Sequence, residues 1–399
     1  MTQPLTFFVF AYWHDPRWRG FVGAGVKIRD MARNLAERGH RVTLFLPRSG
    51  FAKKNRPFAV IEIPLLNLPG LRSISYNIFL FCHLVFLWRS LQPDVVYLRR
   101  TSLIVPLLYA KMKKAAFYLE INDDPFAGRR EEGGRVKFRL RSFLSETLDR
   151  INIRFADRCF AISGAVIEKI GRRMPAVPSG KMIIMPSGAN TDLMQPRETE
   201  QARRTVGLDA NLHYIGFVGS LLSHQGVEYL IEAAPSIIRS VPTARFLIVG
   251  EGPMKRIWKE QAGAKGLERF FIFTGEIAYD ELPPWINVMD VCVAPYHRDA
   301  GLRSPVKVFD YLACGKAVVA SEVDGITGLF RNAPLVTLVR PDSAPSLAAA
   351  LVDVLSRPVG PVIEERMAAH RWVRERFDRR RMAGLVADEA LRQSGGQAP

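Results

Sequence analysis

The chain of 399 residues is poor in cysteine, in acidic residues and in long apolar runs, and each shortage excludes a class of protein. Its four cysteines are scattered without metal-ligand spacing, which excludes a disulfide-stapled secreted domain and predicts no bound metal. The most apolar window, 76–88, is interrupted by Asn77 and His83 and is too short to span a bilayer. The first residues carry no basic segment, so we expect no signal peptide.

Positive charge is what the chain has in excess. Its 56 Lys and Arg residues against 39 Asp and Glu residues leave a net charge of +17. Such a charge predicts an acidic partner, which can be nucleic acid, an anionic membrane surface or a phosphorylated substrate. We expect no nucleic acid, because the sequence shows neither an aromatic platform nor a helix-turn-helix pattern.

Apolar strand-like runs alternate with helical patterns along almost the whole chain, in two series. The first series has expected strands at 5–12, 41–47, 95–98, 116–121, 159–163 and 183–185, and a helix at 25–38. The second has expected strands at 214–218, 245–249, 271–274, 291–294, 317–320 and 335–339, with helices at 227–240, 254–266 and 344–356. This pattern predicts an α/β protein with two doubly wound, Rossmann-like domains facing across a cleft.

The domain boundaries are expected near a turn-rich section and a charged stretch that follows it. The turns run from 186 to 196, and the charged stretch from 197 to 204 is typical of a linker or of a helix start beside one. We therefore predict a first domain over 1–198 and a second over 199–371. A final charged helix is expected at about 364–393, of which 372–393 would pack back on the first domain.

The stretch 304–321 is the most informative one. Ser304 is expected to cap a helix that begins at Pro305 and ends at Gly315. Lys307 would lie in the first turn, where the helix dipole disfavours a cation, and an anionic ligand would remove that conflict. Ser304, Lys307 and Asp310 share one helix face, so a phosphate could bind near Lys307 and a sugar diol near Asp310. The alternative is an ordinary helix with a solvated polar face.

Three loops between a strand and a helix contain glycine. The first holds Gly23 and Gly25, the second Gly219 and Ser220, and the third Gly252. Glycine allows the backbone to approach a phosphate closely at a helix N-terminus. Each loop could also be a turn that simply needs glycine, but three of them at the same edge of two sheets favour a ligand.

The run 120–124 closes an expected buried strand with polar side chains. Glu120 and Asn122 are candidates for orienting the hydroxyl groups of a substrate. The alternative is local turn chemistry before Pro125.

The segment 129–158 is basic and amphipathic. It could lie on an anionic membrane leaflet through Arg135, Lys137, Arg139 and Arg141, and high salt would then release it. The alternative is a helix packed on the first domain with a solvated basic face.

In their order along the chain, these motifs resemble those of the GT-B glycosyltransferases, specifically the retaining family 4 group. The second half matches at 217–220, 224–233, 247–253, 273–277, 293–296 and 304–315, which includes Ser-Pro-Val-Lys-Val-Phe-Asp-Tyr-Leu-Ala-Cys-Gly. The first half matches at 38–42, 93–97, 120–123, 156–158 and 184–191. The resemblance covers nearly the whole chain.

The resemblance implies an enzyme that moves a sugar from a nucleotide-diphosphate sugar to an acceptor hydroxyl with retention, without a metal or another cofactor. The first domain would bind the acceptor and the second the donor. Asp310 stands in the place of the family's ribose-binding glutamate, and Ile277 would offer backbone groups to the base. Ser304, Lys307 and the loop at Gly23 and Gly25 would meet the phosphates.

Three positions depart from the family pattern. Leu302 stands where the family commonly has a glutamate, Ser220 where it has an arginine, and Gln225 where it has a lysine. Lys307 or Arg303 is then expected to supply the missing positive charge. The same departures motivate an alternative, a non-catalytic GT-B-like subunit that binds a membrane or a protein partner.

The charge and the aromatic-rich window at 76–88 together predict where the enzyme works. We expect a cytoplasmic protein at the inner face of the membrane, acting in polysaccharide biosynthesis. Its acceptor would be a lipid-linked or cell-surface glycan precursor, and an anionic membrane surface would be its partner.

Overall fold

A computed structural model describes residues 3–12, 23–48, 56–66, 68, 71–101, 103–126, 136–302, 304–357 and 362–395, without the side chains of 23, 24, 136–142 and 395. The chain divides into two compact units. Among the described residues, unit 1 comprises 3–12, Ala24–Pro186 and the segment from Arg379 onward, and unit 2 comprises Gly23 and Ser187–Asp378. Unit 2 thus extends beyond 199–371 at both ends.

Unit 1 is built on a parallel sheet of seven strands in the order β3-β2-β1-β4-β5-β6-β7. These strands are β1 (Thr6–Phe10), β2 (Arg41–Pro47), β3 (Ala59–Ile63), β4 (Val95–Arg99), β5 (Ala116–Ile121), β6 (Arg158–Ala161) and β7 (Met182–Ile184). The central strands are buried on both faces, which explains their continuous apolar sequences.

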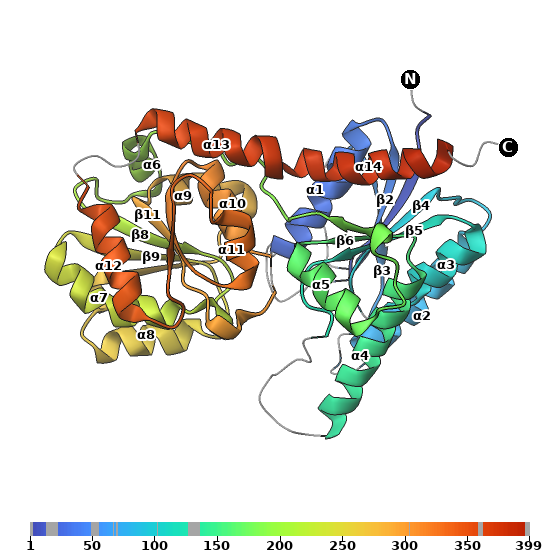
Figure 1. Cartoon of the computed structure of the whole chain (residues 1–399), viewed down its shortest axis with the longest axis horizontal. Coiled ribbons are helices and arrows are strands. Elements are labelled where there is room, and N and C mark those ends of the chain that lie inside the picture. Colours follow the sequence, from blue (N-terminus) through green and yellow to red (C-terminus); the bar gives the residue numbers. More distant parts are fainter. Residues whose placement is uncertain are drawn as a thin grey trace. The chain divides into compact units, whose positions relative to one another are not determined.

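Helices cover both faces of the unit 1 sheet (Figure 1). They are α1 (Gly23–Glu37), α2 (Arg72–Phe86), α3 (Val105–Lys113), α4 (Val136–Phe155), α5 (Gly164–Arg173) and α14 (Arg379–Gly395). Local sequence sets some of their ends. Ser163 caps α5 by accepting a hydrogen bond from the Val166 backbone N–H, and α3 ends at Lys114 in the left-handed conformation.

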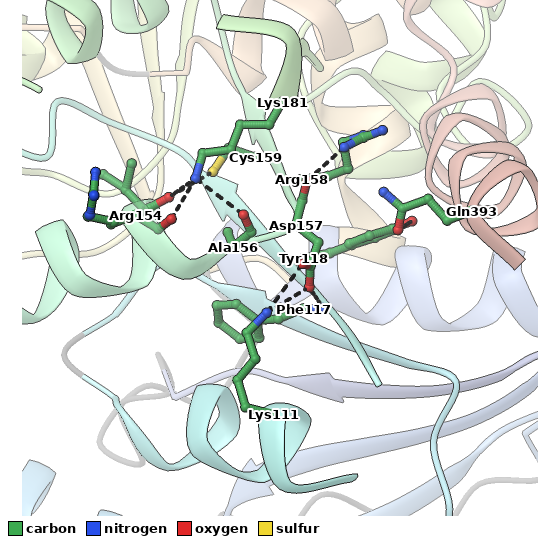
Figure 2. Close-up of polar contacts among 11 residues, drawn as sticks. Lys111, Phe117, Tyr118, Arg154, Ala156, Asp157, Arg158, Cys159, Lys181 and Gln393 are labelled. Carbon is green, nitrogen blue, oxygen red and sulfur yellow. Dashed lines mark hydrogen bonds and ion pairs between the residues drawn. The ribbon is translucent and has the colours of Figure 1, made fainter. Parts of the chain in front are cut away.

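Side chains fix the C-terminal end of α4 to the sheet (Figure 2). The Lys181 ammonium donates to the backbone carbonyls of Ile153, Arg154 and Ala156, at 2.6, 2.8 and 3.2 Å. These carbonyls belong to the last turn of α4 and its end, where the helix dipole favours a cation. Asp157 accepts hydrogen bonds from the Lys111 ammonium and the Phe117 backbone N–H.

The last helix of the chain, α14, packs on unit 1. Arg379 and Asp30 of α1 form an ion pair in which both side chains are buried. Arg158 pairs with Glu389, and the Tyr118 hydroxyl donates to Gln393 Oε1 at 3.0 Å (Figure 2 shows this hydrogen bond). Two segments from opposite ends of the chain therefore complete one unit.

Unit 2 is built on a parallel sheet of six strands in the order β10-β9-β8-β11-β12-β13. The strands are β8 (His213–Val218), β9 (Ala244–Val249), β10 (Phe271–Gly275), β11 (Val291–Ala294), β12 (Ala317–Ser321) and β13 (Val336–Val339). Alternate residues of β12 enter different clusters: Ala317 and Val319 face one core, and Val318 and Ala320 face the other. The sheet is therefore buried on both faces.

Helices lie on both sides of the unit 2 sheet, with α7, α8 and α12 on one side and α9, α10 and α13 on the other (Figure 1). They are α6 (Thr199–Val206), α7 (Val227–Ser240), α8 (Lys255–Ala264), α9 (Leu282–Asn287), α10 (Val306–Ala313), α11 (Asp324–Phe330), α12 (Ala344–Leu355) and α13 (Ile363–Phe377). The two sheets, both doubly wound, confirm the α/β class expected from the sequence.

The single final helix expected at 364–393 is wrong, because α13 and α14 are separated at Asp378. Asp378 has an extended backbone, with φ −67° and ψ 136°, and accepts a hydrogen bond from the Thr191 hydroxyl. The Phe377 carbonyl accepts from the Ala189 N–H at 3.0 Å. These contacts with a distant segment replace the helical hydrogen bonds at the break.

The start of α10 also differs from the expected one. The helix begins at Val306, and Pro305 precedes it with no side-chain cap. Ser304 is not the cap, because its hydroxyl bonds the Ser187 hydroxyl instead. No helix in the described part of the chain is long and apolar enough to cross a membrane.

Candidate active site

The strand order of unit 2 reverses between β8 and β11. In open parallel sheets, ligands bind outside the carboxyl ends of the strands at such a switch point. Gly219 follows β8, and Pro295 and Tyr296 follow β11. The first turn of α10 reaches the same place, because a Cβ atom added to Gly219 would lie 3.1 Å from Lys307 Nζ.

Lys307 is the central residue of this edge. Its side chain is 9% exposed, and its Nζ lies 2.5 Å from Gln225 Oε1 and 3.6 Å from the centre of the Phe217 ring. The Tyr296 ring lies 5.2 Å away on centre. Burial holds the pKa of the Lys307 ammonium well below its ordinary value. Among the described residues, no carboxylate lies within ion-pair distance of Lys307.

A buried cation with aromatic neighbours and an amide, but no acid, is costly unless an anion joins it. A phosphate oxygen beside Lys307 would meet that requirement. The position of the ammonium is fixed from behind, because the buried Tyr311 hydroxyl accepts a hydrogen bond from the Val218 N–H at 2.7 Å. That bond ties the middle of α10 to the end of β8.

Asp310 lies one turn further along α10, on the same face as Lys307. It is 5% exposed, and its Oδ1 accepts a hydrogen bond from the Tyr279 hydroxyl at 3.0 Å. Ile277 precedes this tyrosine and packs half-buried against the core. The structure thus brings a cation and a carboxylate into one stripe, as the spacing of Lys307 and Asp310 indicated.

Close packing of neighbouring loops requires glycine at two positions of the site. A Cβ atom at Gly250 would lie 2.0 Å from the Gly219 carbonyl oxygen, and one at Gly252 would lie 2.5 Å from that of Leu221. The backbones of neighbouring loops cross here at a distance that only glycine permits. Glycine at 250 and 252 is therefore explained by loop packing, and it carries less weight as a sign of a ligand than the sequence indicated.

Unit 1 places the other candidates in a buried cluster. Glu120, 1% exposed, pairs with Lys27 at 2.6 Å and accepts from the Tyr97 hydroxyl at 2.6 Å. Lys27 also donates to Asn122 Oδ1 at 3.2 Å. Burial alone would raise the pKa of Glu120, but the charges of Lys27 and Arg99 and the hydrogen bonds lower it to about 2. Glu120 is therefore an ionised residue that holds Lys27 in position.

The remaining candidates are placed as follows. Gly25 is buried in the first turn of α1, which begins at Gly23. Ser220 is half-buried in the loop after β8. Arg303 lies outside the described residues, and Leu302 directly precedes it. Roles for these residues in donor binding stay predictions.

Sequence reasoning missed the aromatic residues of the site. Phe217 lies near the end of the buried strand β8, and Tyr296 follows the buried strand β11. At such positions the sequence predicts that an aromatic side chain belongs to the hydrophobic core. Tyr279 and Tyr311 lie in helical segments and donate or accept through their hydroxyls. Only their distance from Lys307, Asp310 and β8 in the folded chain shows that they belong to the site.

Known families match both units. Residues 22–193 match the model described as "Glycosyltransferase Family 4", and residues 213–357 match the one described as "Glycosyl transferases group 1". The chain is a glycosyltransferase with the GT-B fold. Its resemblance to the retaining family 4 group is consistent with both matches.

Curated relatives of this glycosyltransferase are distant. It is 24% identical over 323 residues to the 2-deoxystreptamine N-acetyl-D-glucosaminyltransferase of Streptomyces fradiae, over 76% of this chain and 75% of that protein. It is 28% identical over 207 residues to the 2-deoxystreptamine glucosyltransferase of Streptomyces kanamyceticus. That second match covers 51% of this chain and about half, 52%, of the relative.

Solved structures resemble the glycosyltransferase over nearly its full length. The sucrose-phosphate synthase of Thermosynechococcus elongatus has a TM-score of 0.78 at 18% identity, over 99% of this chain and 100% of that one. WaaG, a glycosyltransferase involved in lipopolysaccharide biosynthesis, has a TM-score of 0.76 at 17% identity, over 97% and 99%. At such identities the likeness shows the fold.

Proposed function

We propose that this glycosyltransferase moves a sugar from a nucleotide-diphosphate sugar to an acceptor hydroxyl, with retention of configuration. The observation that carries the proposal is the buried Lys307 ammonium, which has no carboxylate within ion-pair distance in the described part of the chain. It lies where ligands of parallel sheets bind. Asp310, one turn along the same helix face, would accept hydrogen bonds from the ribose hydroxyls.

Lys307 also accounts for two departures from the family pattern. The family's lysine is replaced by Gln225, whose amide oxygen lies 2.5 Å from Lys307 Nζ. The Lys307 ammonium therefore lies beside the space that the side chain of a lysine at position 225 would occupy. We infer that Lys307 supplies the charge that Gln225 and Ser220 lack.

In the proposed transfer, the bond between the anomeric carbon and the diphosphate oxygen breaks, and a bond to the acceptor oxygen forms on the same face of the sugar. The acceptor's proton passes to the leaving phosphate. Lys307 and the positive end of the α10 dipole stabilise the negative charge that develops on the diphosphate. Independence from a metal is proposed on the strength of these fixed positive groups.

Calorimetric titration with a panel of nucleoside mono- and diphosphates tests the donor site. We expect one nucleoside diphosphate to bind, and more tightly than its monophosphate, because the second phosphate can contact Lys307. A protein that binds none of the panel would favour the non-catalytic subunit. The matches to glycosyltransferase families do not favour that alternative.

The acceptor is proposed to be a lipid-linked or cell-surface glycan precursor, met at an anionic membrane. The basic residues first considered for this contact, Arg135, Lys137, Arg139 and Arg141, have side chains outside the described part of the chain. A different surface of unit 1 supports the proposal. Helix α2 and Leu71, which directly precedes it, carry five apolar side chains along one face, each about half exposed: Leu71, Ile74, Ile78, Phe81 and Val85.

This apolar face of α2 is well suited to a lipid surface. Its spacing of three and four residues is that of a single helical stripe, and the opposite side of α2, with Tyr76 and Leu80, is buried. Phe86 adds a side chain that is 86% exposed. Residues 64–119 contain seven Lys and Arg but only one acid, Asp94, so this part of the chain has a net positive charge. Apolar side chains with basic neighbours are typical of helices that lie in an anionic bilayer interface.

Vesicle co-sedimentation tests this contact. We expect binding to vesicles that contain phosphatidylglycerol, weaker binding to neutral vesicles, and partial survival of binding in high salt, because apolar insertion is not screened. The variants Ile78→Asp and Phe81→Asp should lose binding. Ile257→Asp, which changes an exposed apolar side chain on α8 of unit 2, is the matched control and should bind normally. Absence of binding by the native protein would favour a soluble acceptor.

A further inference from the structure

A second charged cluster of unit 2 lies beside the donor site. Its centre is His297, three residues after β11. Its Nε2 lies 2.6 Å from Glu228 Oε1, and its Nδ1 lies 3.2 Å from Asp342 Oδ1. Glu228 belongs to the first turn of α7, and Asp342 follows β13. One imidazole ring therefore joins three separate segments of the chain.

The groups that face this ring include two acids, one cation and a phenol. The Tyr229 hydroxyl lies 3.3 Å from Nδ1, and its ring meets that of His297 edge-on at 5.1 Å. Burial, followed by the neighbouring Asp342, raises the pKa of Tyr229 to about 12, so the phenol is neutral. Arg298 Nε lies 3.5 Å from Asp342 Oδ2, and the Arg298 N–H donates to both oxygens of that carboxylate.

The ring can satisfy both carboxylates only in its imidazolium form. A neutral imidazole has one N–H donor and presents a lone pair at the other nitrogen, which would face an acid. The imidazolium donates from both nitrogens at once. Asp342 is held in a left-handed conformation, φ +56°, which aspartate tolerates when its side chain is hydrogen-bonded.

This cluster is connected to Lys307 by two short paths. The His297 backbone N–H donates to the carbonyl of His224 at 3.3 Å, and His224 directly precedes Gln225. The Gln225 amide nitrogen contacts His224 Nε2 at 3.3 Å, while its amide oxygen contacts Lys307. On the other path, His297 directly follows Tyr296, whose ring lies 5.2 Å from the ammonium.

The two loops also touch through their backbones. A Cβ atom at Gly226 would lie 1.8 Å from the Pro295 carbonyl oxygen, so the segments at 223–226 and 295–297 are packed directly together. A shift of the segment after β11 would therefore move both Tyr296 and Gln225 relative to Lys307.

We propose that the cluster of Glu228, His297 and Asp342 positions the donor site, with His297 as a positioning residue whose charged form holds Tyr296 and Gln225 around Lys307. The inference rests on the proposed binding of a nucleotide diphosphate at Lys307. No contact between His297 and the nucleotide is required. Loss of the charge on His297 loosens the segment after β11 and lowers the affinity of the site.

Calorimetric titration of the full chain with the nucleoside diphosphate that binds best, repeated over a series of pH values, tests the proposal, because an imidazole loses its charge as the pH rises. The variant His297→Gln keeps a hydrogen-bonding side chain but no charge. We expect it to bind about 3–10-fold more weakly than the native protein at the lowest pH, which is less than the loss of a direct charge-assisted contact because His297 acts through Tyr296 and Gln225. The ratio of the two affinities should approach one as the pH rises.

The nucleotide's own ionisation affects both proteins equally and cancels in that ratio. Glu228→Gln should lower the affinity in the same way. The matched control is His213→Gln, because His213 is also half-buried in unit 2 and bonds Thr243, but it lies at the opposite end of β8 from the site. That variant should bind as the native protein does at every pH, and thermal unfolding should show that all variants are folded.

The outcomes separate this inference from the donor site itself. If Lys307→Ala lowers the affinity but His297→Gln does not, or if the His297→Gln ratio is the same at every pH, the positioning role is wrong. If Lys307→Ala leaves the affinity unchanged, the donor site is wrong and the test of His297 has no site to report on. A loss in both variants, with the expected dependence on pH, supports both.

Discussion

Replacing Lys307 by methionine separates what its charge does for binding from what it does for folding. Methionine keeps an unbranched side chain of similar length that can pack against Phe217, but it carries no charge. A contact between an ammonium and a phosphate contributes about 1.5–3 kcal/mol, so nucleoside diphosphate affinity should fall by about 10–150-fold. Isothermal titration calorimetry at fixed ionic strength measures this loss.

The same variant should not destabilise the ligand-free protein strongly. Removing a buried ammonium relieves its desolvation cost, while Gln225 Oε1 loses a donor, at about 1–3 kcal/mol, and Phe217 loses a cation contact, at about 0.5–2 kcal/mol. These effects have opposite signs, so the free energy of unfolding at neutral pH should change by no more than about 2 kcal/mol. Urea denaturation measures it.

The free energy of unfolding should also depend on pH in a direction that Lys307 determines. Because burial lowers the pKa of folded Lys307, the unfolded chain binds more protons between that lowered pKa and the ordinary value of 10.5. Native stability from this residue should therefore rise with pH through this window, and the methionine variant should lack that rise. Unaltered nucleotide affinity would refute the phosphate role, and a loss of stability far above 2 kcal/mol would refute the claim that the buried charge is a net cost.

Three further predictions concern α10 and the residue that precedes β12. A nucleotide without ribose hydroxyls should bind the native protein more weakly than the complete nucleotide does. In the Asp310→Ala variant, removing these hydroxyls should cost little further affinity, because groups in contact are non-additive in a double-mutant cycle, and additive losses would place Asp310 elsewhere. At a pH between the lowered pKa of Lys307 and its ordinary value, nucleotide binding should take up protons at Lys307, which gives a binding enthalpy that depends on the buffer. Lys307→Arg should abolish the uptake because arginine stays protonated, and equal uptake in that variant would assign the proton to another group. Burial lowers the pKa of Lys316 to about 8, so its ammonium should destabilise the fold by about 3 kcal/mol below that pH. Lys316→Met should therefore raise the free energy of unfolding more at pH 7 than at pH 9.5 and leave nucleotide affinity unchanged. A larger rise at pH 9.5 than at pH 7 would show that the ammonium is stabilised in the folded state.

Much of the sheet in unit 2 could be predicted from sequence because its strands are apolar runs bounded by glycine, proline or charge. β11 at Val291–Ala294 and α7 at Val227–Ser240 have the expected bounds. The edge strand β3 was not predicted, since its half-buried Ala-Val-Ile-Glu-Ile sequence lacks the continuous apolar character of a central strand. The break at Asp378 was missed for another reason, namely that its cause is a contact with Thr191, far away in sequence.

The candidate site was predicted in part. The misfit of Lys307 with the helix dipole indicated a residue of special environment, and the structure places it in a buried position beside Gln225. That partner is 82 residues away in sequence, so no local pattern could reveal it. Gly250 and Gly252 are weak evidence for a ligand, because the crossing of two backbones needs glycine at these positions whether or not a ligand binds.

The placement of α14 on unit 1 has a consequence for the order in which the protein is made. A ribosome releases residues 24–186 first and 379–395 last, so unit 2 is available in full before unit 1 is. Until the final helix emerges, Asp30 cannot form its buried ion pair with Arg379, and Glu389 cannot reach Arg158. The unit whose synthesis starts first is therefore the last to be completed, and all of unit 2 emerges while unit 1 has its seven strands but still lacks α14.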